Sequence, residues 1–281
     1  MNIPPSFKVS LAALATAGAA LAPAITHAQT QPSAMGGSEW KTALSIYAYL
    51  PTISGATTFP TVPGNPSPGV NVDANTIIDH LKMTFMGSLD IHNGKWGVFN
   101  DILYLDVGGN KSNVRNFSVD GVPANVTADM SLDIKGTIWT VAGEYRMATS
   151  DPAFTVDVLG GARMFNMKNT LGWNFTGTAG SHPLAGRSGS TAISETLWDA
   201  IIGVKGNYTF GAERQWFVPF YFDIGTGQSD LTYQIVGGIG YRYKWGDVVA
   251  AWRYLDYNMK SGKPIETMNF NGPMIGATFR W

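Results

Sequence analysis

The sequence predicts a transmembrane antiparallel up-and-down β-barrel of about ten strands, with eight or twelve strands as alternatives. Three features indicate this fold: apolar and polar residues alternate along many segments, the joints between segments alternate in length, and the chain ends in an aromatic-rich strand. Of its 281 residues, 44% are hydrophobic and only 14% are charged, so the chain is too apolar to remain disordered.

The alternation is clearest in the segment LKMTFMGSLDI, residues 81–91. Successive residues of a strand point to opposite faces, so Phe85 and Leu89 lie on one face and Ser88 and Asp90 on the other. The pattern recurs near 40–47, 132–138, 153–175, 198–205, 214–226, 230–244, 247–260 and 267–281. In segment 95–107, Asn100, Asp101 and Asp106 put polar residues on both faces of the strand. We therefore predict a bulge there.

The joints are short at one end of the predicted strands and longer at the other. Short joints occur at 92–95, 148–151, 211–214 and 245–247, and Asn93-Gly94 suits a type I′ turn. Longer joints occur at about 51–79, 108–125, 176–193 and 261–266, with a shorter one near 227–229. This arrangement is typical of membrane barrels with both termini on the short-turn side. Because a barrel has no free edge, the first strand should pair with the last one.

The N-terminal residues have the pattern of a signal peptide. A lysine precedes a run of small and apolar residues, and Thr26 and Ala28 occupy the positions that signal peptidase prefers. The run is short for a membrane anchor, and no stretch of eighteen apolar residues follows it. We therefore predict a cleaved signal peptide at 1–28, a short segment at 29–38 and a single barrel domain at 39–281.

The C-terminal residues GATFRW place Gly276 before two aromatic residues, Phe279 and Trp281. This ending resembles the assembly signal of bacterial outer-membrane barrels, and the whole chain resembles the small OmpA-type and OmpW-type barrels. The signal peptide predicts export through the inner membrane, and the resemblance implies that the chain then inserts into the bacterial outer membrane. It also implies contact with outer-membrane lipid and lipopolysaccharide, and with the barrel-assembly machinery during biogenesis.

Aromatic residues cluster near the predicted short-turn ends, as an interfacial belt requires. They are Trp40, Trp96, Tyr145, Tyr208, Trp216, Tyr243, Phe279 and Trp281. The alternative fold is a secreted β-sandwich, which has alternating strands too but gains nothing from aromatic residues gathered at one rim.

The polar faces of the predicted strands carry charges of both signs. The residues assigned to the lumen are Lys82, Asp90, Asp133, Lys135, Asp157, Arg163, Asp199, Lys205, Asp223, Arg242 and Arg253, with Met86, Trp139, Leu159 and Tyr221 on the same face. Mixed charges in a narrow interior should pair, because an unpartnered buried charge is costly. A largely sealed lumen with a structural or surface-interaction role follows, and the alternative is a narrow porin-like channel or conduit for small solutes.

Little in the sequence indicates chemistry. The formal net charge is −1 and there is no cysteine, which argues against a nucleic-acid partner and excludes disulfides and thiolate sites. No spacing recommends a metal site or a cofactor. We predict no enzyme, because no family motif surrounds the histidines. The alternative is a rim enzyme acting on lipid or peptide, with Asp79, His80, Ser181 and His182 as its candidates. The polar loop 51–79 is a candidate surface for a partner.

Overall fold

The computed structural model describes residues 39–57, 70–72, 81–119, 122–179 and 182–281. The compact unit that contains them spans Ser38–Trp281. The predicted signal peptide and the segment 29–38 lie outside the described residues, so both stay predictions. Within the described ranges, no helix is long and apolar enough to cross a membrane.

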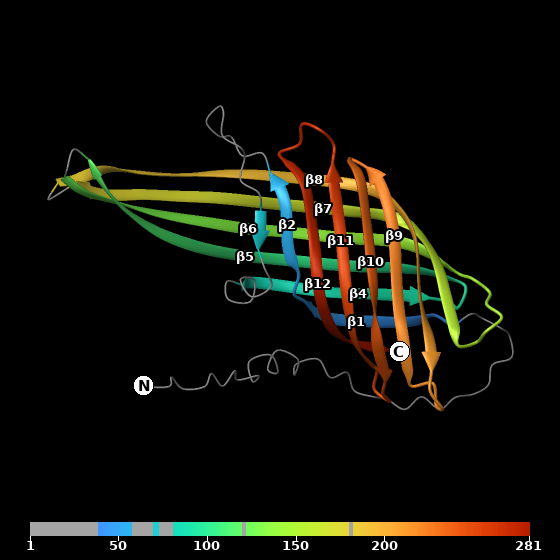
Figure 1. Ribbon diagram of the computed structural model, residues 1–281. Coiled ribbons are helices and arrows are strands. Elements are labelled where there is room, and N and C mark those ends of the chain that lie inside the picture. The colour runs from blue at the N-terminus through green and yellow to red at the C-terminus, as the bar shows by residue number, and fades with distance from the viewer. Residues whose placement is uncertain (1–38, 58–69, 73–80, 120–121, 180–181) are drawn as a thin grey trace, which may run out of the picture. The chain divides into compact units, whose positions relative to one another are not determined.

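The described elements are all β-strands (Figure 1). Their bounds are β1 (Lys41–Tyr49), β2 (Thr52–Thr57), β3 (Val70–Val72), β4 (Leu81–His92), β5 (Trp96–Val119), β6 (Val122–Arg146), β7 (Phe154–Ala179), β8 (His182–Phe210), β9 (Trp216–Gly227), β10 (Ser229–Arg242), β11 (Asp247–Met259) and β12 (Ile265–Arg280).

Ten of the described strands, β1 and β4 to β12, form a closed antiparallel ring. Each strand pairs with the next, and β12 pairs with β1 over Met274–Arg280. Thr42 and Trp281 exchange backbone hydrogen bonds of 2.9 and 3.1 Å at this seam. Strand β2 pairs with β12 beyond the end of β1, and β3 pairs with β2. The predicted strand number and the predicted pairing of the first and last strands are confirmed.

Four neighbouring strands are much longer than the others. β5 to β8 have 24 to 29 residues, whereas β4 and β9 have 12 each. Figure 1 shows the four running together well past the ends of the other strands. We call the part beyond the ring the projecting sheet, residues 108–119, 122–133, 170–179 and 182–192. At about 3.3 Å per residue, β5 continues for about 40 Å in it.

The projecting sheet corrects two of the predicted loops. Most of 108–125 and of 176–193 is paired strand: Lys111 is paired with Met130 and Trp173 with Gly189. These two segments contain many Gly, Ser, Thr and Asn residues. They lie beyond the ring, where neither face of the sheet needs to be apolar. The alternation that reveals a half-buried strand is therefore absent.

Two belts of aromatic residues surround the outside of the ring. The predicted belt lies at the short-turn ends, where the Trp96 and Tyr145 rings are 4.7 Å apart. A second belt, which the sequence did not reveal, includes Trp139 and Trp198 at 5.9 Å, together with Tyr233, Trp252 and Tyr254. The prediction that Trp139 faces the lumen was wrong.

The two belts enclose an apolar band on the outer wall. On β8, Tyr208 and Trp198 are separated by about 33 Å of strand, which corresponds to about 25 Å along the membrane normal at a tilt of about 40°. Residues between them on the same face include Val204, Ile202 and Ala200, and Ile202 is 62% exposed. The ring, the band and the belts define a transmembrane β-barrel.

Two smaller predictions differ from the structure. Strand β5 pairs without interruption from Trp96 to Val119, so 95–107 holds no bulge against β6. The irregularity against β4 lies between Leu81 and Met83. The turn after β4 is not type I′ either, because Gly94 has a φ of 86° but Asn93 does not have a positive φ. Instead, Asn93 Oδ1 accepts hydrogen bonds from the backbone N–H groups of Lys95 and Trp96.

Candidate functional site

Apolar side chains fill the half of the lumen that lies away from the short turns. The Phe165 and Tyr257 rings are 4.6 Å apart, and both residues are completely buried. We call this group the apolar plug: Ile53, Leu103, Leu105, Ile134, Ile138, Phe165, Met167, Ile193, Leu197, Leu255, Tyr257, Met259, Ile265, Met268 and Phe270. Packed apolar side chains leave few voids as large as a water molecule. At this level the interior of the ring is therefore packed with apolar side chains.

A buried network around Arg253 lies next to the apolar plug. Its guanidinium donates to Asp101 Oδ2 at 2.8 Å, to Gln234 Oε1 at 2.6 and 3.0 Å and to Tyr47 Oη at 2.9 Å. The Tyr47 hydroxyl in turn donates to Asp101. The Tyr49 ring lies 5.6 Å from the guanidinium. The network joins β1, β5, β10 and β11 across the interior, so it ties opposite parts of the ring together.

A second buried ion pair joins β7 to β9. The Arg163 guanidinium contacts Asp223 Oδ2, and both side chains have no exposed surface. Arg163 also donates to Thr140 Oγ1 at 3.0 Å and to Thr232 Oγ1 at 3.4 Å. The neighbouring Asp199 carboxylate accepts the Ser229 backbone N–H at 2.8 Å. An arginine with three polar partners in a closed interior meets the requirement that a buried charge be both paired and hydrogen-bonded.

Ion pairs also line the lumen close to the short turns. Lys205 contacts Asp90 and lies 2.7 Å from Glu144 Oε2, with its Nζ 4.5 Å from the centre of the Phe99 ring. Its side chain is only 13% exposed. One lysine is therefore held between two carboxylates from β4 and β6.

Two further groups lie at the inner mouth of the lumen, the end next to the short turns. Arg146 contacts both carboxylate oxygens of Asp157, through Nε and Nη2. Its Nη2 atom is also 3.5 Å from His92 Nε2. On the other side of the ring, Arg280 contacts Asp247, and Arg242 Nε lies 3.6 Å from the same carboxylate. Paired charges thus cover this end as well, and no single sign dominates as it would in an ion-selective pore.

Most of the charges predicted to lie in the lumen do point into the interior or its inner mouth: Asp90, Asp157, Arg163, Asp199, Lys205, Asp223, Arg242 and Arg253. The prediction was wrong for Asp133 and Lys135. Lys135 is 58% exposed on the outer face of β6, where it pairs with Asp106, and Asp133 lies two residues away on the same face. Lys82 lies in β4, but its side chain is outside the described part of the structure.

The wrong placement on β6 has a physical cause. The apolar plug makes the inner face of β6 apolar at Ile134 and Ile138, and the outer face becomes polar where the strand leaves the membrane. On this part of β6, an apolar residue therefore does not have to face the lipid. Asp101 and Glu144 were missed as lumen residues, although the belt position of Tyr145 implies that its neighbour Glu144 points inward.

The residues of the predicted assembly signal lie at the seam of the barrel. Phe279 and Trp281 belong to the aromatic belt at the short turns, and both side chains are well exposed. Gly276 is paired with Tyr47 of β1. A Cβ atom at this position would lie 2.7 Å from Tyr47 Cβ and 3.0 Å from the Ile46 carbonyl oxygen. The seam therefore has no room for a side chain at Gly276.

The side chains of the four catalytic candidates are not among the described parts of the structure. Asp79, His80 and Ser181 lie outside the described residues, and for His182, which begins β8, only the backbone is described. The predicted absence of enzyme activity therefore stays a prediction. Within the described ranges, no three His, Cys, Asp or Glu side chains converge as a metal site.

On β7 and β8, the described outer face of the projecting sheet and of the strand segments leading into it is polar. On β7 and β8 its exposed side chains are Asn166, Lys168, Asn174, Thr176, Ser188, Ser190, Ser194 and Thr196. Asn166 donates to Thr196 at 2.7 Å across the two strands. Small hydroxyl and amide groups on a paired sheet give a hydrophilic surface with fixed spacing, which contrasts with the apolar band directly below it.

No protein-family model matches the chain, and no curated protein matches it. Among solved structures, it is similar to the attachment invasion locus protein Ail of Yersinia pestis, with 11% identity and a TM-score of 0.29 over 86% of this chain and 99% of Ail. It is similar to the translocator domain of the autotransporter NalP of Neisseria meningitidis, with 11% identity and a TM-score of 0.34 over 88% and 90%. For the toluene transporter TbuX of Ralstonia pickettii, the values are 9% and 0.24 over 88% and 90%. Similarity this low carries no conclusion about function.

Proposed function

We propose that this chain is an integral protein of the bacterial outer membrane with a closed lumen, and that it acts through its outer surface. In this proposal the ring is an anchor, and the projecting sheet presents a structural or binding surface outside the cell. The strongest support is the combination of a blocked interior with four strands that continue about 40 Å beyond the ring.

The closed lumen supports a surface role over transport. A solute that follows the barrel axis meets paired charges at the inner mouth and then the apolar plug. Opening this path requires that the Arg163 and Arg253 networks break, or that plug residues such as Phe165 move. A narrow conduit remains the alternative function, and it requires such a rearrangement. Catalysis at the rim is not part of the proposal.

The direction of insertion follows from the loops. In outer-membrane barrels, short turns face the periplasm and long connections face outward. The projecting sheet then lies outside the cell together with β2 and β3. Its exposed Ser, Thr and Asn side chains on β7 and β8 favour a polar partner, because such groups exchange hydrogen bonds and bury little apolar area. Outer-membrane lipid and lipopolysaccharide would surround the apolar band.

Cysteine labelling tests this orientation, since the chain contains no natural cysteine. Ser190 is exposed in the projecting sheet, and Glu213 is exposed in the short turn between β8 and β9. We expect a membrane-impermeant maleimide to label Ser190→Cys on intact cells. Glu213→Cys should react only after the outer membrane is permeabilised.

The matched control is labelling of both variants in detergent, where each should react fully. Labelling of Glu213→Cys but not of Ser190→Cys on intact cells would reverse the orientation and refute a surface role for the projecting sheet.

A further inference from the structure

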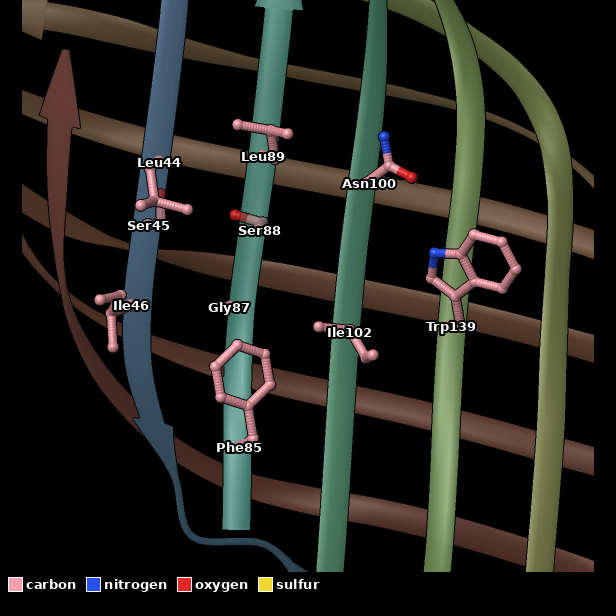
Figure 2. Close-up of a pocket in the computed structure, with 10 residues that line it drawn as sticks. All are labelled: Leu44, Ser45, Ile46, Phe85, Gly87, Ser88, Leu89, Asn100, Ile102 and Trp139. Carbon is pink, nitrogen blue, oxygen red and sulfur yellow. The ribbon is translucent and has the colours of Figure 1, made fainter.

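Two lysines lie next to each other on the outer wall, just beyond the second aromatic belt. The outer end of the apolar band on β5 and β6 is marked by the paired residues Ile102 and Trp139, which Figure 2 shows on neighbouring strands. Lys135 is four residues beyond Trp139 on β6, about 13 Å along the strand or about 10 Å along the membrane normal at a tilt of about 40°. Because long lysine side chains extend back toward a membrane surface, an ammonium group here reaches the level of the lipid head groups.

The second lysine, Lys168, is paired directly with Lys135 across β6 and β7. Both residues are exposed on the outer face. Residues paired in this way have Cβ atoms about 5 Å apart, and two like charges so placed destabilise a sheet. Asp106 offsets only part of this repulsion: its Oδ2 atom is 3.5 Å from Lys135 Nζ, and Lys168 has no ion-pair partner among the described residues. The wall therefore holds two adjacent ammonium groups whose hydrogen-bond donors are largely unused.

Amide and hydroxyl groups lie beside the two lysines on the same face. On the side nearer the belt, Asn166 Nδ2 donates to Thr196 Oγ1 at 2.7 Å, which leaves the second amide hydrogen and the hydroxyl hydrogen available to a ligand. Ser194 is paired with Lys168 on the other side and is exposed. Several donors thus face outward from one small area of paired sheet. The oxygen atoms of a phosphate suit such donors, and lysine binds phosphate as a point charge.

We propose that Lys135 and Lys168, with Asn166 and Thr196 beside them, bind a phosphate group on the lipid A part of lipopolysaccharide. The inference rests on the direction of insertion proposed above, which places the two lysines in the outer leaflet. A phosphate between the two ammonium groups replaces their repulsion by attraction to a common anion. The lysine pair is then a binding site, and its local cost is of the kind that functional sites carry.

An ordinary surface ion pair between Lys135 and Asp106 is the competing explanation. It accounts for Lys135 but leaves Lys168 opposite a like charge. General attraction of lipid phosphate to the wall does not replace a specific site either. On β11, two residues beyond Tyr254 of the same belt, Asp256 is on the outward side and would repel a phosphate. On the described wall, the lysine pair therefore favours one place for the phosphate.

Binding of lipid A to the purified full chain in detergent tests the site. We expect diphosphorylated lipid A to bind about fivefold more weakly to Lys168→Gln, and about 25-fold more weakly to the double variant Lys135→Gln with Lys168→Gln. The matched control is Lys244→Gln, which removes an exposed lysine in the short turn between β10 and β11 and should bind like the unmodified chain. All variants should keep heat-modifiable folding, because each change is on the surface.

Three further ligands identify the source of the phosphate. Lipid A without its phosphates should bind the unmodified chain no better than diphosphorylated lipid A binds the double variant. Inorganic phosphate and phosphatidylglycerol, at the same concentration, should not displace diphosphorylated lipid A. Equal binding by the lysine variants and the unmodified chain, equal binding with and without the phosphates, or displacement by either competitor would refute the site. These results do not depend on how the barrel is inserted in the cell, whereas reversed cysteine labelling would refute the proposed function itself.

Discussion

Replacing Arg163 by methionine should destabilise the barrel by about 3–5 kcal/mol, the usual cost of leaving one member of a buried ion pair without its partner. Asp223 would then lie uncompensated in a site where both side chains have no exposed surface. Asp223→Leu should cause a loss of similar size. The measurement is urea-induced unfolding in lipid vesicles, followed by the fluorescence of the nine tryptophans.

The double variant Arg163→Met with Asp223→Leu should recover most of this loss, because an apolar pair of similar volume often replaces a buried ion pair without a penalty. Lys135→Met is the control, since it removes the lysine of an ion pair on the exposed outer face, and it should leave stability unchanged. Additive losses in the double variant would show that Arg163 and Asp223 are not coupled, contrary to the network described above.

The second large effect is expected at the seam between β1 and β12. Gly276→Val should impair closure of the ring, because the new Cβ would meet Tyr47 Cβ at 2.7 Å. Overpacking of this kind typically costs about 1–3 kcal/mol. The loss should be at the upper end, because Tyr47 also holds Asp101 and Arg253 in place.

The control is Gly237→Val. A Cβ atom at Gly237 on β10 meets no atom within 4 Å, so this variant should fold like the unmodified chain. The measurement is the folded, heat-modifiable fraction after refolding into vesicles. Because no assembly machinery is present, the result separates a steric effect at Gly276 from its predicted role as an assembly signal. Equal folding of the two variants would argue against the packing explanation.

The part of the fold that lies in the membrane could be predicted from the sequence. There, lipid imposes an apolar outer face, and the inner face is often polar, so a period of two is visible on strands such as 198–205. The closure of the ring followed from the same reasoning, because an open edge is excluded in lipid. The pairing of Thr42 with Trp281 bears this out.

The rest of the fold could not be predicted from the sequence. Apolar residues face the lipid at one level of the barrel and the interior at another, so the residue type alone does not identify the face. Ile138 is of a type that commonly faces lipid, yet it belongs to the apolar plug. Trp139, on the opposite face, belongs to the second aromatic belt. Beyond the membrane, β7 and β8 carry polar residues on a paired sheet, and this resembles loop composition.

The measurement that tests the central claim most directly is the current through the folded, heat-modifiable protein in a planar lipid bilayer. The apolar plug and the paired charges at the inner mouth predict a silent membrane at every voltage that the bilayer tolerates. Reproducible discrete openings that disappear when the protein is unfolded before addition would contradict the closed lumen. In that case a solute conduit would replace the surface role as the leading function.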